Sequence, residues 1–333
     1  MGSIDAVPST APAEAVRAHA DRVEAALAAL PLPEAPAELY EPVRYVLQSG
    51  GKRVRPVLLL LAAEAYGAAP DEALPAALAV EVFHNFTLVH DDIMDRAAER
   101  RGRATVHTVW DEGTGILTGD LLMGLAYELL GQTAPGRLPD TLRVFGTMVR
   151  RLCEGQALDA AFEQRDDVTV PRYLDMIERK TAALLEAALE IGGLIGGADE
   201  AARGRLRTAG RELGRAFQLQ DDLLDLTADD PGWGKTIGGD LVQGKRTFLL
   251  LRSIELAEGD ERAWFERVLD GGLPESDVAE ARARMERLGV LDEAAALAQA
   301  HYEAGRAALE RLPAGTARSA LLGLADRLGR RVR

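Results

Sequence analysis

The chain has 333 residues, a net charge of −14 and a single cysteine. The acidic balance argues against nucleic acid or an anionic membrane surface as the main partner. One cysteine cannot form an intramolecular disulfide, which agrees with a reducing compartment. The N-terminus lacks the pattern of a signal peptide, and the most apolar stretch, residues 57–63, is too short to span a bilayer. We therefore expect a soluble, cytoplasmic protein without stable membrane insertion.

The pattern of apolar residues predicts helices along the whole chain. Residues 1–13 are small, polar and proline-bearing, and predict a disordered lead-in to one domain over residues 14–333. No alternating run is long enough to predict a strand, and aromatic residues make up only 5% of the chain. We predict an all-α fold, a single large helical domain with core helices around a central cavity. The expected helices cover residues 13–30, 37–49, 55–67, 71–96, 115–132, 138–162, 171–196, 199–227, 240–258, 260–270, 275–288, 291–312 and 316–331.

The same acidic pentad, Asp-Asp-x-x-Asp, occurs at residues 91–95 and again at residues 221–225, each inside an apolar helical segment. Because residues i and i+4 share a face of a helix, Asp91 lies over Asp95, and the second pentad repeats this arrangement. Carboxylates spaced in this way repel one another. Mg²⁺ takes oxygen ligands and is usually held by one or two carboxylates plus substrate phosphates. Two such clusters on converging helices predict a site for a polyphosphate and its metal ions.

Basic residues lie near both pentads in the sequence. Residues 50–56 (Gly-Gly-Lys-Arg-Val-Arg-Pro) place two glycines and three cations at a predicted helix start, which suits anion binding, and the equal alternative is a solvated charge cluster in a loop. Residues 96–103 add further cations, which suit a diphosphate or merely neutralise the aspartates. Residues 234–247 add two lysines shortly after carboxylates, as a metal–diphosphate complex requires. Lys180 lies in an aliphatic stretch, so it has a functional partner or extends to the surface. His84 lies seven residues before the first pentad on nearly the same face, facing the site or packed structurally.

Taken in order, these motifs resemble those of the trans-isoprenyl diphosphate synthases, the polyprenyl synthetase family. The resemblance runs from about residue 38 to residue 330 and is closest in kind to the short-chain geranylgeranyl and farnesyl diphosphate synthases. It implies an isoprenoid synthase-type fold, a homodimer, and Mg²⁺ as cofactor with three ions in each active site. The motifs that carry it lie at residues 51–56, 84, 91–95, 100–102, 119–120, 180–181, 217–225, 234–235 and 244–247.

The family's reaction is the condensation of isopentenyl diphosphate with an allylic diphosphate (dimethylallyl, geranyl or farnesyl). In these enzymes Mg²⁺ assists the ionisation of the allylic C–O bond, and the allylic cation then alkylates the double bond of isopentenyl diphosphate. Metal ions and basic side chains stabilise the departing pyrophosphate more than the ground state. An aliphatic cavity keeps water from the carbocation.

The resemblance also implies a role for each motif residue. The direct metal ligands would be Asp91, Asp95 and Asp221. Aspartates that act through water or neighbouring ligands would be Asp92, Asp222 and Asp225. The allylic diphosphate would be bound by Arg100, Lys180, Lys235 and Lys245. The isopentenyl diphosphate would be bound by Lys52, Arg55, His84 and Arg101. Residues near the reacting carbons would be Thr181, Gln218 and Phe217.

The residues just before the first pentad bear on product length. An aromatic residue at the fifth position before it, Phe86, a small one at the fourth, Thr87, and no insertion within the pentad resemble enzymes that make the C20 product geranylgeranyl diphosphate. Farnesyl diphosphate (C15) synthases usually have two aromatics or a two-residue insertion. Ordinary core packing is the alternative interpretation of Phe83 and Phe86.

Three other functions compete with a C20 synthase besides a C15 synthase. A class I terpene cyclase would replace the second pentad and lack the basic residues 52–55. A non-catalytic subunit of a heteromeric prenyl synthase would be expected to lose aspartates or arginines, and none is missing here. A Ca²⁺-binding helix bundle would not explain the cations around both pentads.

Overall fold

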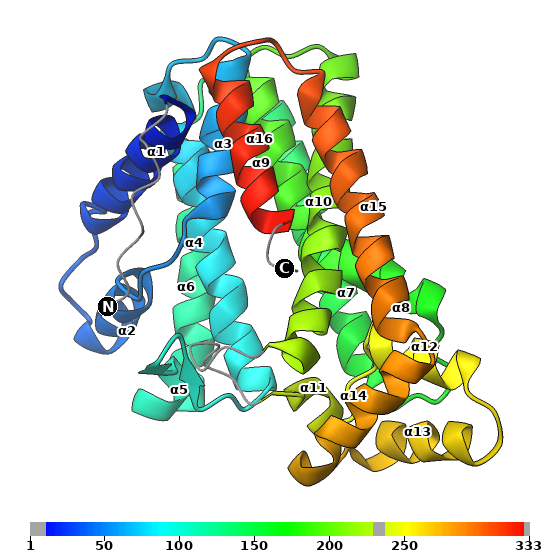
Figure 1. Ribbon diagram of the computed structural model, residues 1–333. Coiled ribbons are helices and arrows are strands. Elements are labelled where there is room, and N and C mark those ends of the chain that lie inside the picture. The colour runs from blue at the N-terminus through cyan, green and yellow to red at the C-terminus, as the bar shows by residue number, and fades with distance from the viewer. Residues whose placement is uncertain (1–10, 229–236, 330–333) are drawn as a thin grey trace. The chain divides into compact units, whose positions relative to one another are not determined.

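The computed structural model describes residues 11–228 and 237–329 (Figure 1). Regular structure in these residues is helical except for two short strands, β1 (Glu99–Arg100) and β2 (Arg103–Ala104), which confirms the all-α prediction. The chain divides into two compact units, each described here by itself. Unit 1 comprises Met1–Phe145, Ala188–Gly204 and Leu312–Gly323, and unit 2 comprises Gly146–Ala187, Arg205–Arg311 and Leu324–Arg333.

The helices follow one another with short connections. In chain order the α-helices are α1 (Ala11–Ala28), α2 (Ala37–Leu47), α3 (Val54–Ala65), α4 (Pro70–Met94), α5 (Val106–Val109), α6 (Glu112–Leu130), α7 (Leu138–Phe162), α8 (Val170–Ile177), α9 (Ala183–Ile195), α10 (Glu200–Thr227), α11 (Gly239–Val242), α12 (Phe248–Leu256), α13 (Gly259–Gly271), α14 (Val278–Arg287), α15 (Val290–Glu310) and α16 (Thr316–Gly329). A π-helical turn, η1 (Glu178–Ala182), joins α8 to α9, and a 3₁₀ turn, η3 (Glu275–Asp277), precedes α14.

The structure departs from the expected elements in three places. α1 begins at Ala11, so residues 11–13 are helical rather than part of a disordered lead-in, and residues 1–10 lie outside the described part. The helix expected over residues 171–196 contains the π-helical turn η1. The helix expected over residues 240–258 is two helices, because the backbone between α11 and α12 takes a positive φ of 64° at Gly244.

Unit 1 is built around α3, an apolar helix with almost no polar face. Its residues Val57 to Ala63 are all buried, as expected for a helix covered on every side. α4 packs against α3 and α6, which lie beside it in Figure 1. Phe83 of α4 is fully buried and meets the Phe145 ring edge-on at 5.3 Å between centroids. This packing fixes the helix that carries the first pentad.

Unit 2 has its own apolar core, to which α8, α10, α12, α13 and α15 all contribute. Its largest fully buried side chains include Ile177, Phe248 and Phe265. Each such side chain stabilises the fold by roughly 1.5–3 kcal/mol relative to exposure. The core supports the part of α10 that carries the second pentad, since Leu219, Leu223 and Leu226 are buried in it. In neither unit does a described helix have the length and apolar character needed to cross a membrane.

Candidate active site

The first acidic pentad lies at the C-terminal end of α4. Asp91 and Asp92 occupy the last turn, which ends at Met94, and Asp95 follows directly. The C-terminus of a helix carries partial negative charge, so it is an unfavourable place for carboxylates. The last turn of α4 contains no basic residue that would offset them. The pentad therefore needs positive charge from outside its own helix.

Part of that charge comes from the hairpin that follows α4. Its strands pair Arg100 with Arg103 across a two-residue turn, in which Arg101 and Gly102 take positive φ values of 56° and 72°. The Nε atom of Arg100 donates to Asp92 Oδ1 at 2.6 Å. Burial raises the pKa of Asp92, and the Arg100 guanidinium opposes that rise. The hairpin thus brings one guanidinium to the buried carboxylate of the pentad.

A second group of cations lies at the start of α3. Arg55 Nη1 donates to His84 Nε2 at 3.1 Å, so the neutral His84 ring carries its proton on Nδ1. Arg101 donates to the carbonyl oxygen of Gly50, two residues before the exposed Lys52. Burial, followed by the charges of Arg55 and Arg101, holds the pKa of His84 well below 6.5. Unit 1 therefore brings together four residues expected to bind one diphosphate: Lys52, Arg55, His84 and Arg101.

The two residues expected to limit product length lie on α4. Phe86 is half-buried, and its ring contacts Phe83 at 5.3 Å and His90 at 4.8 Å between centroids. Thr87 is 9% exposed and donates its hydroxyl to the carbonyl of His84. Phe83 is fully buried against Phe145, which is the contact expected of a core residue. Phe86 is thus the more accessible of the two rings.

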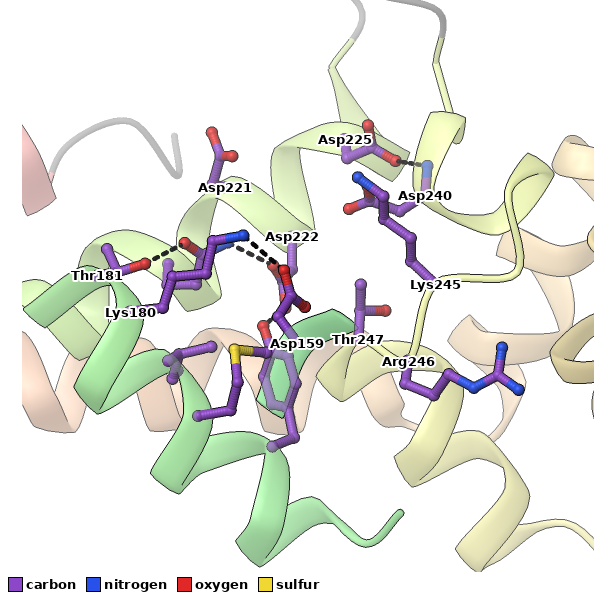
Figure 2. Close-up of a pocket in the computed structure, with 14 residues that line it drawn as sticks. Asp159, Lys180, Thr181, Asp221, Asp222, Asp225, Asp240, Lys245, Arg246 and Thr247 are labelled. Carbon is purple, nitrogen blue, oxygen red and sulfur yellow. Dashed lines mark hydrogen bonds and ion pairs between the residues drawn. The ribbon is translucent and has the colours of Figure 1, made fainter. Parts of the chain in front are cut away.

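The second pentad repeats this placement in unit 2. Asp221, Asp222 and Asp225 lie in the last two turns of α10, which ends at Thr227 and has no basic residue in its last turn. Asp222 and Asp225 are buried, whereas Asp221 is half-buried. Figure 2 shows that the Asp222 carboxylate points toward Asp159 and that the Asp221 carboxylate points away from it. Adjacent aspartates of the pentad thus have different surroundings.

A chain of hydrogen bonds leads to Asp222. The Thr181 hydroxyl donates to Gln218 Oε1 at 3.0 Å, and Gln218 Nε2 donates to Asp222 Oδ1 at 3.1 Å. The Tyr173 hydroxyl donates to the other oxygen of Asp222. Burial and the nearby Asp240 raise the pKa of Asp222 to about 7, against the lowering effect of these hydrogen bonds. Asp222 is therefore held by protein groups on both of its oxygens.

Lys180 and Thr181 lie on the π-helical turn η1, an irregularity that is frequent at functional sites. Close packing supports the turn, because a Cβ at Gly155 of α7 would lie only 2.3 Å from the backbone nitrogen of Lys180. Lys180 Nζ is paired with Asp159 Oδ2 at 2.5 Å. Glu178, at the start of the turn, is paired with two arginines, Arg151 and Arg215. These contacts fix the direction of the Lys180 side chain.

The loop after α11 completes this side of unit 2. Lys245 Nζ lies 3.8 Å from Asp240 Oδ1, and the Asp240 backbone N–H donates to Asp225 at 3.1 Å. Lys235 lies outside the described residues. Phe217 is half-buried on α10, and it is not among the described side chains that line the adjoining cavity.

The second pentad, the turn η1 and the loop after α11 line a cavity of about 180 Å³ within unit 2 (Figure 2). Carboxylates outnumber cations along its wall. The acids are Asp159, Asp221, Asp222, Asp225 and Asp240, and the cations are Lys180, Lys245 and Arg246. Such a lining suits a ligand that brings both metal ions and phosphate groups.

The carboxylates of the two pentads fit Mg²⁺ only where phosphate oxygens of a ligand complete the coordination of the ion. Over residues 11–228 and 237–329, no group of three His, Cys, Asp or Glu side chains is close enough to hold a metal ion alone. Mg²⁺ commonly binds through one or two carboxylates and completes its coordination with water and substrate phosphate oxygens. Half-exposed Asp91 and Asp221, at the ends of two different helices, present oxygens of this kind.

The sequence did not reveal several residues that line or support these groups. Asp159, Tyr173, Asp240 and Arg246 line the cavity of unit 2, and Glu81 is buried among the arginines of unit 1. Asp159 follows Gln156 by three residues on the amphipathic helix α7, which is a weak signal for a polar pair on one face. The others are single polar residues without a motif, so only the packing of their helices shows what they contact.

Comparison with known proteins agrees with this chemistry. The sequence matches the family model for polyprenyl synthetase over residues 36–285. The geranylgeranyl diphosphate synthase of Methanosarcina mazei is 40% identical over 316 residues, which cover 93% of this chain and 95% of that protein. The short chain isoprenyl diphosphate synthase of Methanothermobacter thermautotrophicus is 39% identical over 87% of this chain and 90% of that protein. The crystal structure of geranylgeranyl pyrophosphate synthetase from Pyrococcus horikoshii Ot3 aligns with a TM-score of 0.88 at 38% identity, covering 95% of this chain and 98% of that one.

The matches extend over most of the chain and include both pentads. The fold is that of the isoprenoid synthases, as predicted. The chain belongs to the polyprenyl synthetase family, and it is an isoprenyl diphosphate synthase, a prenyltransferase.

We expect His84 to remain neutral across the physiological pH range, because burial and the neighbouring arginines depress its pKa. The unfolded chain takes up a proton at this residue below about pH 6.5. Since the folded state does not, His84 should make the free energy of unfolding fall as the pH drops below that value. Above about pH 7.5 the residue should make no contribution to pH dependence.

Long-range nitrogen–proton NMR spectra of the histidine rings, recorded from about pH 8 to pH 5.5, measure this directly. His84 should keep the pattern of a neutral ring protonated on Nδ1. His84→Gln should lose part of the decrease in unfolding free energy below pH 6.5. A His84 ring that titrates near its ordinary pKa would contradict the expectation.

Proposed function

We propose that this synthase condenses isopentenyl diphosphate with dimethylallyl, geranyl and farnesyl diphosphates and releases geranylgeranyl diphosphate as its main product. The observation that carries the proposal is the pair of carboxylate clusters at the ends of α4 and α10, each accompanied by basic side chains. Curated relatives about 40% identical, including that of Methanosarcina mazei, are named geranylgeranyl diphosphate synthase, which supports the C20 product.

The allylic diphosphate binds with Mg²⁺, and three ions are expected in each active site. Asp91, Asp95 and Asp221 would hold the metal ions, whose positive charge would offset the negative charge of the pyrophosphate leaving group. Asp92, Asp222 and Asp225 have protein hydrogen-bond partners of their own, which suits residues that orient the ligands. The basic residues that bind this diphosphate are Arg100, Lys180, Lys235 and Lys245.

The isopentenyl diphosphate binds without metal to Lys52, Arg55, His84 and Arg101. A neutral His84 donates its Nδ1 proton and adds no positive charge to a site that already holds several guanidiniums. Thr181 and Gln218 present oxygen atoms near the cationic carbons, and Phe217 lines the homoallylic site. The released pyrophosphate accepts the final proton, so no side chain of this chain is assigned as the base.

Phe86 forms the floor that ends chain growth at C20. The support for this role is its position five residues before the first pentad and its half-exposed ring. The runner-up product is farnesyl diphosphate, because a stop one isoprene unit earlier requires only a slightly shallower pocket. A terpene cyclase and a non-catalytic subunit fit less well, since basic residues 52–55 and both pentads are intact.

Purified protein supplied with Mg²⁺, isopentenyl diphosphate and each allylic starter in turn should give a C20 product from all three. Phe86→Ala removes the floor and should lengthen the main product beyond C20, as read by chromatography of the hydrolysed alcohols. The control Phe83→Leu changes a buried core ring and should leave product length unchanged. A dominant C15 product, with farnesyl diphosphate refused, would keep the enzyme class and overturn the product assignment.

We also propose that the enzyme is a homodimer through the surface around α6. Ile116 is 43% exposed and Leu117 is 59% exposed, and Met94 at the end of α4 and Val109 at the end of α5 are also exposed. Tyr127 lies three helical turns from Ile116 and is 39% exposed, so the two share a face of α6. Several large apolar side chains exposed on one element are typical of an interaction surface.

Sedimentation velocity tests the dimer. Leu117→Glu places a charge on an already exposed position, so it should shift the protein to the mass of a monomer without unfolding it. Leu256→Glu, an exposed apolar position of unit 2, is the matched control and should remain dimeric. A wild-type protein that sediments as a monomer at micromolar concentration would rule the proposal out.

A further inference from the structure

Arg53 stands between two residues assigned to the isopentenyl diphosphate but has a different environment. Lys52 is exposed, whereas Arg53 is only 3% exposed, and its side chain points into the protein. It is the N-cap residue of α3 and takes a left-handed conformation, with φ 46° and ψ 33°. This region is uncommon for a residue with a long side chain and persists only where the surroundings enforce it. Arg53 is therefore held by its contacts rather than by local preference.

Three elements hold the Arg53 guanidinium. Its Nη1 donates to Glu81 Oε1 of α4 at 2.7 Å, and its Nε donates to Glu24 Oε2 of α1 at the same distance. Its Nη2 donates to the carbonyl oxygen of Leu47, the last residue of α2, at 3.3 Å. One side chain thus ties the start of α3 to three other helices of unit 1.

Glu81 is the carboxylate on which this arrangement depends. It is 3% exposed and lies on α4, one helical turn before His84. Its charge acts on Arg55 and Arg101 as well as on Arg53, since it opposes the lowering of the pKa of each by burial. Without it, Arg53 and Arg55 would lose the buried carboxylate that faces them, and Arg101 would keep only the more distant charge of Asp92.

The backbone that carries Lys52 is fixed from two directions. Arg53 anchors it on the inner side, and Arg101 donates to the carbonyl of Gly50 from the hairpin. A diphosphate recognised without metal depends on the spacing of its cationic partners, because each hydrogen bond weakens steeply with misalignment. A shift of this loop would move Lys52 and Arg55 relative to His84.

We infer that the buried Arg53–Glu81 pair positions Lys52 and Arg55 for the isopentenyl diphosphate. Arg53 and Glu81 are then positioning residues for the acceptor substrate. The inference rests on the proposed function. Residues that only stabilise the fold should affect both substrates alike. Loss of Arg53 and Glu81 should instead weaken the binding of isopentenyl diphosphate and leave the binding of the allylic diphosphate unchanged.

The test is the double variant Arg53→Met/Glu81→Met. Replacing both members of a buried ion pair by apolar side chains of similar volume is often neutral for stability, whereas removing one leaves a buried charge unpaired. The KM for isopentenyl diphosphate should rise by about tenfold or more, because displaced binding groups act less effectively. The KM for geranyl diphosphate should change by less than about twofold.

Calorimetric titration of isopentenyl diphosphate without Mg²⁺ gives the same comparison without turnover. Loss of affinity in the double variant, with a melting temperature close to the wild type, supports positioning. A folded double variant with unchanged affinity and unchanged KM overturns it. Absence of condensation by the wild-type enzyme would instead remove the proposed function, so the two failures are distinguishable.

Two further variants keep the inference testable where the double variant does not fold. Arg53→Lys keeps the charge but cannot reach three acceptors, and Glu24→Gln changes only the exposed partner. Each should raise the KM for isopentenyl diphosphate by a smaller factor, and no change in both would overturn the inference. The matched control is Glu64→Gln, since Glu64 pairs with His19 at 2.9 Å and also joins α1 to α3. It should leave both KM values unchanged.

Discussion

The constraint on which the rest of the structure depends is the placement of clustered aspartates at the C-terminal ends of two helices, where negative charge is unfavourable. Both acidic pentads lie in the final turns of long helices, where the peptide dipoles already carry partial negative charge. Neither helix has a basic residue in its last turn. Such sites are costly in the folded chain alone, and a bound cation with its phosphate ligand would stabilise them. The cost to the free protein is thus coupled to recognition of its ligand.

Neighbouring side chains stabilise the buried aspartate of each pentad, and these side chains differ between the two units. In unit 1, Arg100 pairs with the buried carboxylate of the pentad, and in unit 2, Asp222 is held by hydrogen bonds from Tyr173 and Gln218. In both cases the second aspartate is bound by protein groups, while the first is half-exposed. The basic cluster at the start of α3 is the complement, an excess of positive charge around the buried carboxylate of Glu81.

Periodicity and charge spacing are visible in one dimension, and they predicted the helical fold and pointed to the two acidic pentads with their neighbouring cations, whereas the roles of single residues follow from the family resemblance and stay predictions. Sequence reasoning did not predict the π-helical turn at residues 178–182, since one extra residue in a helical turn leaves composition and periodicity nearly unchanged. It joined α11 to α12 because a glycine is found in helices as well as in turns, and the positive φ of Gly244 that breaks the helix is visible only in the structure. Glu81 and Asp159 were missed for a different reason. A lone acid on a helix gives no sign of its partner until another helix packs against it.

Thermal unfolding with Mg²⁺ and inorganic pyrophosphate tests the central claim most directly, because it reports ligand binding without catalysis. Mg²⁺ and pyrophosphate together should raise the melting temperature more than the sum of their separate effects, and ligand at about 100 times its Kd stabilises by about 2.7 kcal/mol. Asp221→Asn should abolish that extra increase. Equal stabilisation by pyrophosphate with and without Mg²⁺ would contradict the account.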